Sequence, residues 1–186
     1  MMAATLPDRV KWAVDALAIA PSDRVLEIGC GHGTAVSLIC GSLTDGSVTA
    51  IDQSDSMIRI AEKKNAEHIA AGRAKFITAS LHEADLNGER FHKIFAINVN
   101  LFWTNSNCGL DIIKESLLPG GALYVFNQPP AASKLKQIAE RTESRLISAG
   151  FAVRQMIVGE LAPVPAVGVV AQLDDALQYE MGSENE

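Results

Sequence analysis

Short runs of aliphatic and β-branched residues alternate along the chain with segments in which hydrophobic residues recur every three or four positions. The short runs predict β-strands over seven segments, which are Arg24–Ile28, Ser47–Asp52, Lys75–Ala79, Lys93–Asn98, Ala122–Asn127, Phe151–Val158 and Ala166–Leu173. Because helical patterns separate the first five runs, these strands predict an α/β fold with a parallel sheet covered by helices on both faces. The last two runs are joined by a link too short for a crossover helix, so they predict an antiparallel hairpin at the end of the sheet.

The segments between the strands have the spacing of amphipathic helices. Ser54 is a favoured helix N-cap, and it precedes a helical pattern that continues to Ile69 and ends at Gly72. A shorter pattern includes Leu117 and stops at Pro119. Three further helical patterns cover Ala35–Leu43, Ser133–Ala149 and Leu6–Leu17. The last of these precedes the first strand, and we expect it either to pack on the sheet or to act as a lid.

The length and composition predict a single domain. A chain of 186 residues with 48% hydrophobic content can bury one core, and it contains no run of ~20 apolar residues that a membrane helix needs. The first twelve residues carry three charges and are not typical of a secretory signal, so we expect a cytoplasmic protein. The domain is predicted to span residues 1–186, with a helical region or lid over 1–21, a core over 22–173 and a polar tail over 174–186.

The charge and the positions of cysteine and histidine limit the partners. A net charge of −6 disfavours a nucleic-acid partner, because affinity for phosphate backbones comes largely from lysine and arginine. The mildly basic segment 134–145 alternates with glutamates and is typical of the solvated face of a helix. Neither the cysteines nor the histidines have the spacing of metal ligands, so no metal site is predicted. These residues are Cys30, Cys40, Cys108, His32, His68, His82 and His92.

A glycine-rich turn follows the first strand. The sequence Glu27-Ile28-Gly29-Cys30-Gly31-His32-Gly33 places three glycines at alternate positions, and Asp52 ends the second strand 19 residues after the last of them. Such a turn exposes backbone N–H groups to a ligand, and a carboxylate on the neighbouring strand is placed to accept hydrogen bonds from a ribose. Glycines after a strand are also ordinary turn residues, but the three-glycine spacing and the distance to Asp52 favour a nucleoside cofactor.

Further along the chain, Leu-Leu-Pro-Gly-Gly precedes the fifth strand, and the predicted hairpin ends the sheet. With the glycine turn and Asp52, these features make the chain resemble the class I S-adenosylmethionine-dependent methyltransferases over roughly residues 22–173. The best local matches are residues 27–33 and 50–57. The resemblance implies a doubly wound, seven-stranded, mostly parallel sheet of the Rossmann-like methyltransferase type, with S-adenosylmethionine as cofactor and methyl transfer to a small molecule as the activity.

The resemblance also implies which residues contact the cofactor. The glycine turn would line its methionine end, Asp52 would accept both ribose hydroxyls, and Gln53 and Met57 would lie against the adenine. Many members of the family carry an acidic residue after the third strand, whereas this chain has Ser80 and Leu81 there, which predicts a weaker contact to the adenine. The implied cofactor-binding set is therefore Glu27, Gly29, Cys30, Gly31, Gly33, Asp52, Gln53, Met57, Ser80, Leu81 and Asn98.

The acceptor side of the predicted site has no single diagnostic residue. In the family the end of the fourth strand lies under the transferable methyl group, where Asn98 is expected either to contact ligand or to hold the following loop. Phe102 and Trp103 are adjacent in that loop, so we expect one of them to face the substrate. The candidate catalytic residues are His32, Asn98 and Trp103; His82 is the second histidine expected near this edge, and His92 is expected at the opposite edge.

Two other functions fit parts of the pattern. The absence of an acid near Ser80 favours a protein that binds S-adenosylmethionine without turnover. A nicotinamide-dependent reductase would have the same strand–turn–helix arrangement at its cofactor site. Two features of the sequence disfavour a reductase: the third glycine follows the second by two positions instead of three, and the sheet ends in a hairpin. The chain has no large insertion over the predicted site, which favours a small acceptor or a homodimer partner that completes the site.

Overall fold

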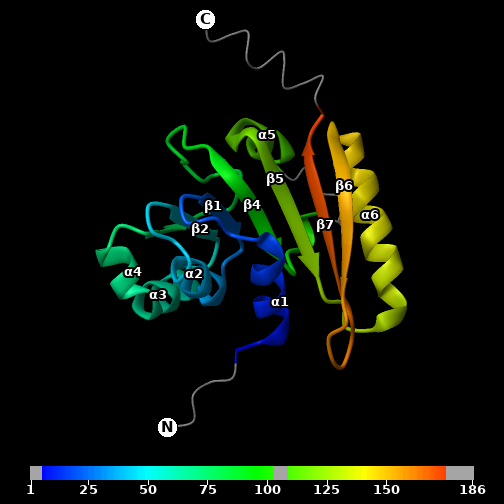
Figure 1. Cartoon of the computed structure of the whole chain (residues 1–186), viewed down its shortest axis with the longest axis horizontal. Helices are drawn as coiled ribbons and strands as arrows, with labels where there is room; N and C mark the ends of the chain where they lie inside the picture. The colour runs from blue at the N-terminus through cyan, green and yellow to red at the C-terminus, as the bar shows by residue number, and fades with distance from the viewer. Residues whose placement is uncertain (1–5, 103–108, 175–186) are drawn as a thin grey trace, which may run out of the picture.

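One seven-stranded sheet with helices on both faces organises the protein (Figure 1). The computed structural model describes residues 6–102 and 109–174. The strands are β1 (Arg24–Ile28), β2 (Ser47–Asp52), β3 (Ala74–Thr78), β4 (Phe91–Ile97), β5 (Leu117–Asn127), β6 (Phe151–Gly159) and β7 (Ala166–Leu173). Their order is β3-β2-β1-β4-β5-β7-β6, with β1 to β5 parallel and β7 antiparallel to both of its neighbours. The predicted doubly wound fold and terminal hairpin are confirmed.

The sheet separates two hydrophobic cores. Successive side chains of a strand point to opposite faces, and Val25 and Leu26 accordingly belong to different cores. Helices α1 (Asp8–Leu17), α2 (Thr34–Cys40) and α3 (Asp55–Lys64) contribute to one core, and α5 (Leu110–Ser116) and α6 (Leu135–Ser148) contribute to the other. The chain also forms α4 (Ala66–Ala70) and two short 3₁₀ helices, η1 (Asn100–Phe102) and η2 (Ala132–Lys134). No helix in the described ranges has the length and hydrophobicity needed to cross a membrane.

The helix that Ser54 begins is interrupted at Asn65, where the sequence predicts one continuous helix. Ser54 caps α3 as expected, because its side chain accepts a hydrogen bond from the Met57 amide. The Asn65 side chain is buried and donates to the Ala61 carbonyl at 2.8 Å and to the Gly33 carbonyl at 3.1 Å. These bonds connect the break between α3 and α4 to the end of the glycine turn, a contact that local periodicity does not encode.

The fifth strand begins earlier than predicted. Leu117, which the sequence places in a helix, pairs with Phe91 of β4, so α5 ends at Ser116. The residue before a proline is biased toward extended backbone, and Leu118 precedes Pro119. The predicted helix is therefore shortened, and the Pro-Gly-Gly segment lies within the strand.

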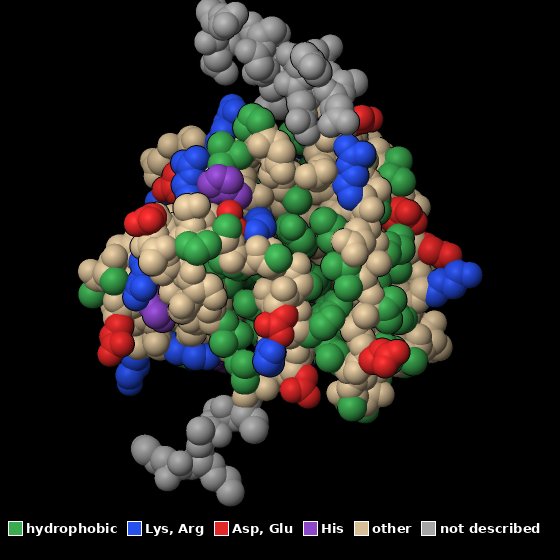
Figure 2. Space-filling view, viewed as in Figure 1, with side chains coloured by type: hydrophobic (Ala, Val, Ile, Leu, Met, Phe, Trp, Pro, Cys, Tyr) green, Lys and Arg blue, Asp and Glu red, His purple; other side chains and the backbone are tan. Residues whose placement is uncertain are grey.

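The N-terminal helix packs on the sheet. Ala13 and Leu17 of α1 are fully buried, and the Trp12 ring meets the Phe126 ring edge-on with centroids 5.3 Å apart. An added Cβ on Gly168 of β7 would lie 2.8 Å from the Phe126 ring, so the glycine leaves room for this contact. Hydrophobic side chains gather beside α1 on the same face, over β5 and β7 (Figure 2). The packing is the first of the two arrangements expected for this helix.

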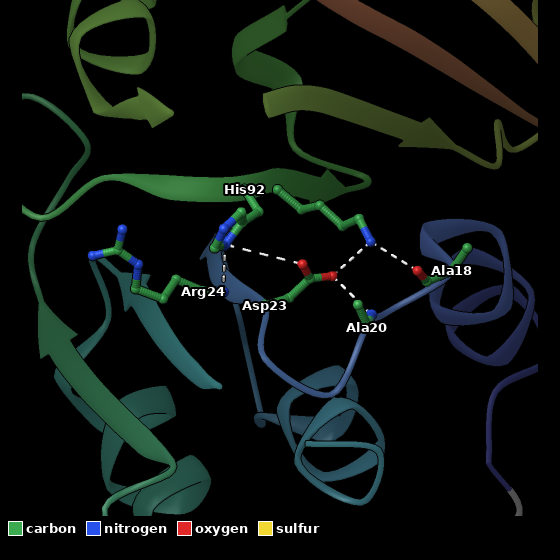
Figure 3. A network of polar contacts seen from close by, with 6 residues as sticks. Ala18, Ala20, Asp23, Arg24 and His92 are labelled. Atoms are coloured by element: carbon green, nitrogen blue, oxygen red, sulfur yellow. Dashed lines mark hydrogen bonds and ion pairs between the residues drawn. The ribbon is translucent and has the colours of Figure 1, made fainter. Parts of the chain in front are cut away.

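A polar network connects the amino end of β4 to the segment that enters β1 (Figure 3). The Nζ atom of Lys93 lies 2.6 Å from Oδ2 of Asp23 and donates to the Ala18 carbonyl at 2.7 Å. Burial alone would raise the pKa of Asp23, but the hydrogen bond and the charge of Lys93 outweigh it and the pKa is lowered. His92 accepts a hydrogen bond from the Arg24 amide. As predicted, His92 is an exposed residue at the edge opposite the carboxyl ends of the strands.

Candidate active site

A cavity of about 520 Å³ opens at the carboxyl ends of the parallel strands. It lies where the strand order reverses, between β1 and β4, which is the usual ligand position in open α/β sheets. Its walls come from the ends of β1, β2, β3 and β4 and from the turns that follow them. They comprise Ile28, Gly29, Ile51, Asp52, Gln53, Ala79, Ser80, Leu81, His82, Ile97, Asn98, Val99, Asn100 and Leu101.

The three glycines of the turn have different structural roles, although all have positive φ. A Cβ on Gly29 would lie 2.6 Å from the Val99 side chain, and a Cβ on Gly33 would lie 2.7 Å from the Asn65 amide. A Cβ on Gly31 would meet nothing within 4 Å. Gly29 and Gly33 are therefore required by packing within the protein, whereas the space beside Gly31 is open to a ligand.

Asp52 organises the turn from the neighbouring strand. Its Oδ2 atom accepts a hydrogen bond from the Gly31 amide at 2.9 Å, and its Oδ1 atom accepts one from the Ser54 amide at 2.9 Å. Each carboxylate oxygen has two acceptor positions, so both oxygens can accept a further hydrogen bond from a ligand. Asp52 thus joins the glycine turn to the start of α3 and also lies on the cavity wall.

Glu27 is a buried carboxyl group directly before the glycine turn. Its side chain is 3% exposed, and its Oε2 atom has no hydrogen-bond partner in the described part of the chain. Burial raises the pKa of Glu27 to about 8, and the negative charge of Asp52 adds to the shift. An unpartnered buried carboxyl group is rare, and a cationic ligand would supply both the missing hydrogen bond and the opposite charge.

Comparison with known proteins decides the family. The model of a family described as a methyltransferase domain matches residues 25–121, just over half of the 186-residue chain. The chain belongs to this methyltransferase domain family. The match covers β1 to the first residues of β5 and therefore includes Glu27, the glycine turn and Asp52.

Individual relatives support the same family for this methyltransferase domain. The uncharacterized methyltransferase YdaC of Bacillus subtilis is 25% identical over 155 residues, covering 81% of this chain and 83% of the relative. The malonyl-acyl-carrier protein O-methyltransferase of Priestia megaterium is 32% identical over 100 residues, covering 53% of this chain and only 34% of the relative. The magnesium protoporphyrin IX methyltransferase of Synechocystis PCC 6803, solved with bound SAH, has a TM-score of 0.69 at 16% identity and covers 90% of this chain and 82% of its own. The last likeness shows a shared fold, and S-adenosylmethionine is the cofactor of the class.

The predicted cofactor residues of the methyltransferase domain divide into two groups. Six of them line the cavity, namely Gly29, Asp52, Gln53, Ser80, Leu81 and Asn98. Five others lie outside its wall, namely Glu27, Cys30, Gly31, Gly33 and Met57. Cys30 is buried, and burial raises the pKa of its thiol, as do the charges of Glu27 and Asp52. Its side chain is thus a neutral packing group behind the turn.

The segment after β3 supplies both polar and apolar wall residues. The hydroxyl of Ser80 donates to Glu83 at 2.7 Å, so its oxygen remains an acceptor toward the cavity. That hydrogen bond is the main cause that lowers the pKa of Glu83. Leu81 is 4% exposed, and His82 lies next to it on the wall. Of the two histidines predicted near this edge, His82 lines the cavity, whereas His32 is exposed and lies outside the wall.

The end of β4 forms the boundary of the cavity. Asn98 has a positive φ of 57°, and its Oδ1 atom accepts a hydrogen bond from the Gln128 amide at 2.7 Å. It therefore holds the neighbouring loop, which is one of the two roles expected for it, and it also lines the cavity. Phe102 is fully buried in the core. Trp103, the other aromatic residue expected near the substrate, lies outside the described residues.

A second cavity of about 440 Å³ adjoins the first, and it shares Asn98 and Asn100 with it. Pro129 and Pro130 form part of its wall, as expected for the loop after β5. Lys134 and Arg141 also line it, which corrects the interpretation of segment 134–145 as a solvated helix face only. Lys134 directly precedes α6, and Arg141 lies within it, about two helical turns further along. This spacing is present in the sequence, but the sequence alone does not show that a cavity lies beside it.

Proposed function

We propose that the first cavity holds S-adenosylmethionine and that the domain transfers its methyl group to a small molecule that enters from the second cavity. The observation that carries this proposal is the combination of Glu27, Gly31 and Asp52. The buried Glu27 carboxyl group lacks a partner, the space beside Gly31 is open, and Asp52 lies on the wall with free acceptor positions. An ammonium group, a compact chain that carries the sulfonium and a ribose diol are the ligand groups that match these three features.

Each residue has a distinct task in this proposal. The cofactor supplies an already activated methyl group, so the protein mainly aligns the two reactants and excludes water. Glu27 neutralises the positive charge at the methionine end, and Asp52 both orders the turn and accepts hydrogen bonds from the ribose. Leu81 and Gln53 bound the adenine side of the cavity. His82 is the histidine on the wall and is the candidate base for acceptors that carry a proton.

The size of the two cavities supports a small acceptor. A volume of about 440 Å³ is within the range of small-molecule sites, and no described element covers the carboxyl edge with an inserted domain. By their names, two relatives act on malonyl-acyl-carrier protein and on magnesium protoporphyrin IX.

The proposed function is tested by measuring binding and turnover separately. Isothermal titration calorimetry should show one-to-one binding of S-adenosylmethionine and of its demethylated product. Incubation with a mixture of small metabolites should then convert the bound methyl donor to the demethylated product. Mass spectrometry measures this conversion. Absence of binding would contradict the proposal, binding without conversion would favour the inactive binding protein, and preferential binding of NADH would favour a reductase.

Replacing Asp52 by Ala is expected to weaken cofactor binding by about 1.5–3 kcal/mol, which is the range for a hydrogen bond to a charged group. The loss combines the ribose contact with the Gly31 and Ser54 amides that Asp52 orders. Calorimetry with the demethylated product checks the affinity, and a urea titration checks that the domain remains folded. Asp55→Ala is the matched control, because Asp55 is a nearby exposed carboxylate outside the cavity wall. Equal affinities of the Asp52 and Asp55 variants would contradict the proposed role.

Assembly and location belong to the same proposal. The exposed hydrophobic side chains of Met156 and Val158 on the edge strand β6 support a homodimer, which sedimentation velocity would test. A cytoplasmic location and the lack of a nucleic-acid partner stay predictions from the sequence and its net charge of −6.

A further inference from the structure

The second cavity has a chemical character that differs from the first. It lies between the carboxyl ends of β4 and β5 and the start of α6, and α6 begins at the edge where β5 ends (Figure 1). Its wall contains two cationic side chains, five amide side chains and no carboxylate. The wall residues are Asn98, Asn100, Asn127, Gln128, Pro129, Pro130, Lys134, Gln137, Ile138 and Arg141.

The two cations of this cavity are available to a ligand. Six of the ion pairs in the described part of the chain join a lysine or arginine to a carboxylate, and none of them involves Lys134 or Arg141. By contrast, the Nζ atom of Lys136 on α6 lies 3.7 Å from Oε1 of Glu140, and Lys136 is outside the cavity wall. In a chain with a net charge of −6, two unpaired cations on one carboxylate-free wall form a local positive site.

The amide groups of the wall complete a polar site. Asn127 is 4% exposed, and it lines the cavity. The Nε2 atom of Gln128 donates to the Val164 carbonyl at 2.8 Å, which holds the loop after β5 in place. The side-chain amide of Asn127 carries N–H groups, which are donors suited to an anionic oxygen.

We propose that the second cavity binds an anionic group of the methyl acceptor, a carboxylate or a phosphate, through Lys134, Arg141 and Asn127. The guanidinium of Arg141 offers a planar pair of donors, and the Lys134 ammonium adds a point charge. The proposal rests on the proposed function, because it assigns the first cavity to the methyl donor. It adds the substrate class, which is a small anionic metabolite or an acidic group of a larger one.

The shared residues Asn98 and Asn100 place the acceptor between the two sites. With its anionic group in the second cavity, the acceptor directs its nucleophilic atom toward the boundary with the first. That atom forms a bond to the methyl carbon while the carbon–sulfur bond breaks, and the bonding electron pair remains on sulfur. A proton on the nucleophile leaves to solvent or to a base, and a carboxylate nucleophile releases none.

Binding of simple anions to the full chain loaded with the demethylated cofactor tests the inference. The probes are malonate, tricarballylate and inorganic phosphate, with malonamide as the neutral counterpart of malonate, and the measurement is calorimetry. At least one anion should bind saturably, and the preference between malonate and phosphate distinguishes a carboxylate site from a phosphate site. The double variant Lys134→Gln, Arg141→Gln should weaken that binding by about a hundredfold or more, because two charged donors are lost and each contributes about tenfold or more.

The matched control is Lys136→Gln, which removes a cation from the same helix but not from the cavity wall. It should bind the anion as the unmodified protein does, and all three proteins should bind the demethylated cofactor equally. The inference is overturned if none of the anions binds, if malonamide binds as well as malonate, or if the double variant retains full anion affinity. Failure of the demethylated cofactor to bind would instead overturn the proposed function, and the assignment of the acceptor site with it.

Discussion

Replacing Gly31 with Val is expected to abolish measurable binding of S-adenosylmethionine. An added Cβ at this position meets nothing within 4 Å in the protein, so the new side chain would occupy the space proposed for the ligand. Removing a cofactor contact typically costs tenfold to a hundredfold in affinity, whereas filling the ligand space excludes the cofactor sterically. Calorimetry with S-adenosylmethionine and with its demethylated product measures the loss.

Backbone strain is separated from ligand exclusion by a matched variant. Gly31 has a φ of +50°, and a β-branched residue there costs on the order of 1–3 kcal/mol of stability. Gly72 has a φ of +70°, and a Cβ there would also meet nothing within 4 Å. It lies just before β3, at the amino end of that strand, whereas the cavity opens at the carboxyl ends of the strands. Gly72→Val should therefore lose similar stability in a urea titration and keep full cofactor affinity. Unchanged affinity of the Gly31 variant would show that the glycine turn is only a turn.

Replacing Glu27 with Gln should remove most of the pH dependence of cofactor affinity. Because the pKa of Glu27 is raised to about 8, the carboxyl group of the free protein is protonated at neutral pH. A cationic ligand favours the ionised form, so binding below pH 8 should release a proton and affinity should rise with pH. At a pH where Glu27 is ionised, Glu27→Gln should bind the cofactor more weakly than the unmodified protein by about 2 kcal/mol or more. This difference in binding free energy should become smaller near pH 6.

Calorimetric titrations with the cofactor compare the unmodified protein and Glu27→Gln across this pH range, in buffers with different heats of ionisation. Titration of the cofactor itself is common to both proteins, so the difference in proton release reports Glu27. Equal proton release by the two proteins would contradict the assignment of Glu27 as the charge partner.

The same group affects the stability of the free protein. A carboxyl group whose folded pKa is raised from 4.5 to about 8 binds its proton more tightly in the folded state. Its contribution to stability is therefore fully present below pH 4.5 and is lost as the pH rises through 8. The unmodified protein should lose stability across this interval when no cofactor is present, and Glu27→Gln should flatten the curve. Urea titrations at several pH values measure the free energy of unfolding of the unmodified protein and of Glu27→Gln.

The sequence by itself determined the order and type of the main elements. Strand periods, helix spacing and turn residues are local properties, so β1, β2 and β7 have the predicted bounds and the hairpin ends the sheet. Asp52 was also identifiable, because one helix between two adjacent parallel strands places it beside the glycine turn at a fixed distance along the chain.

Only the tertiary structure decided which residues meet across long sequence separations. Asn65 interrupts a helix because its amide reaches the carbonyl of Gly33, 32 positions earlier. Leu117 joins the sheet because Phe91 offers a strand partner. Lys134 and Arg141 look like solvated helix residues in the sequence, and they become part of a binding wall because α6 begins beside the end of β4. Such contacts depend on how the elements pack, and local pattern carries no information about a partner that is distant in the chain.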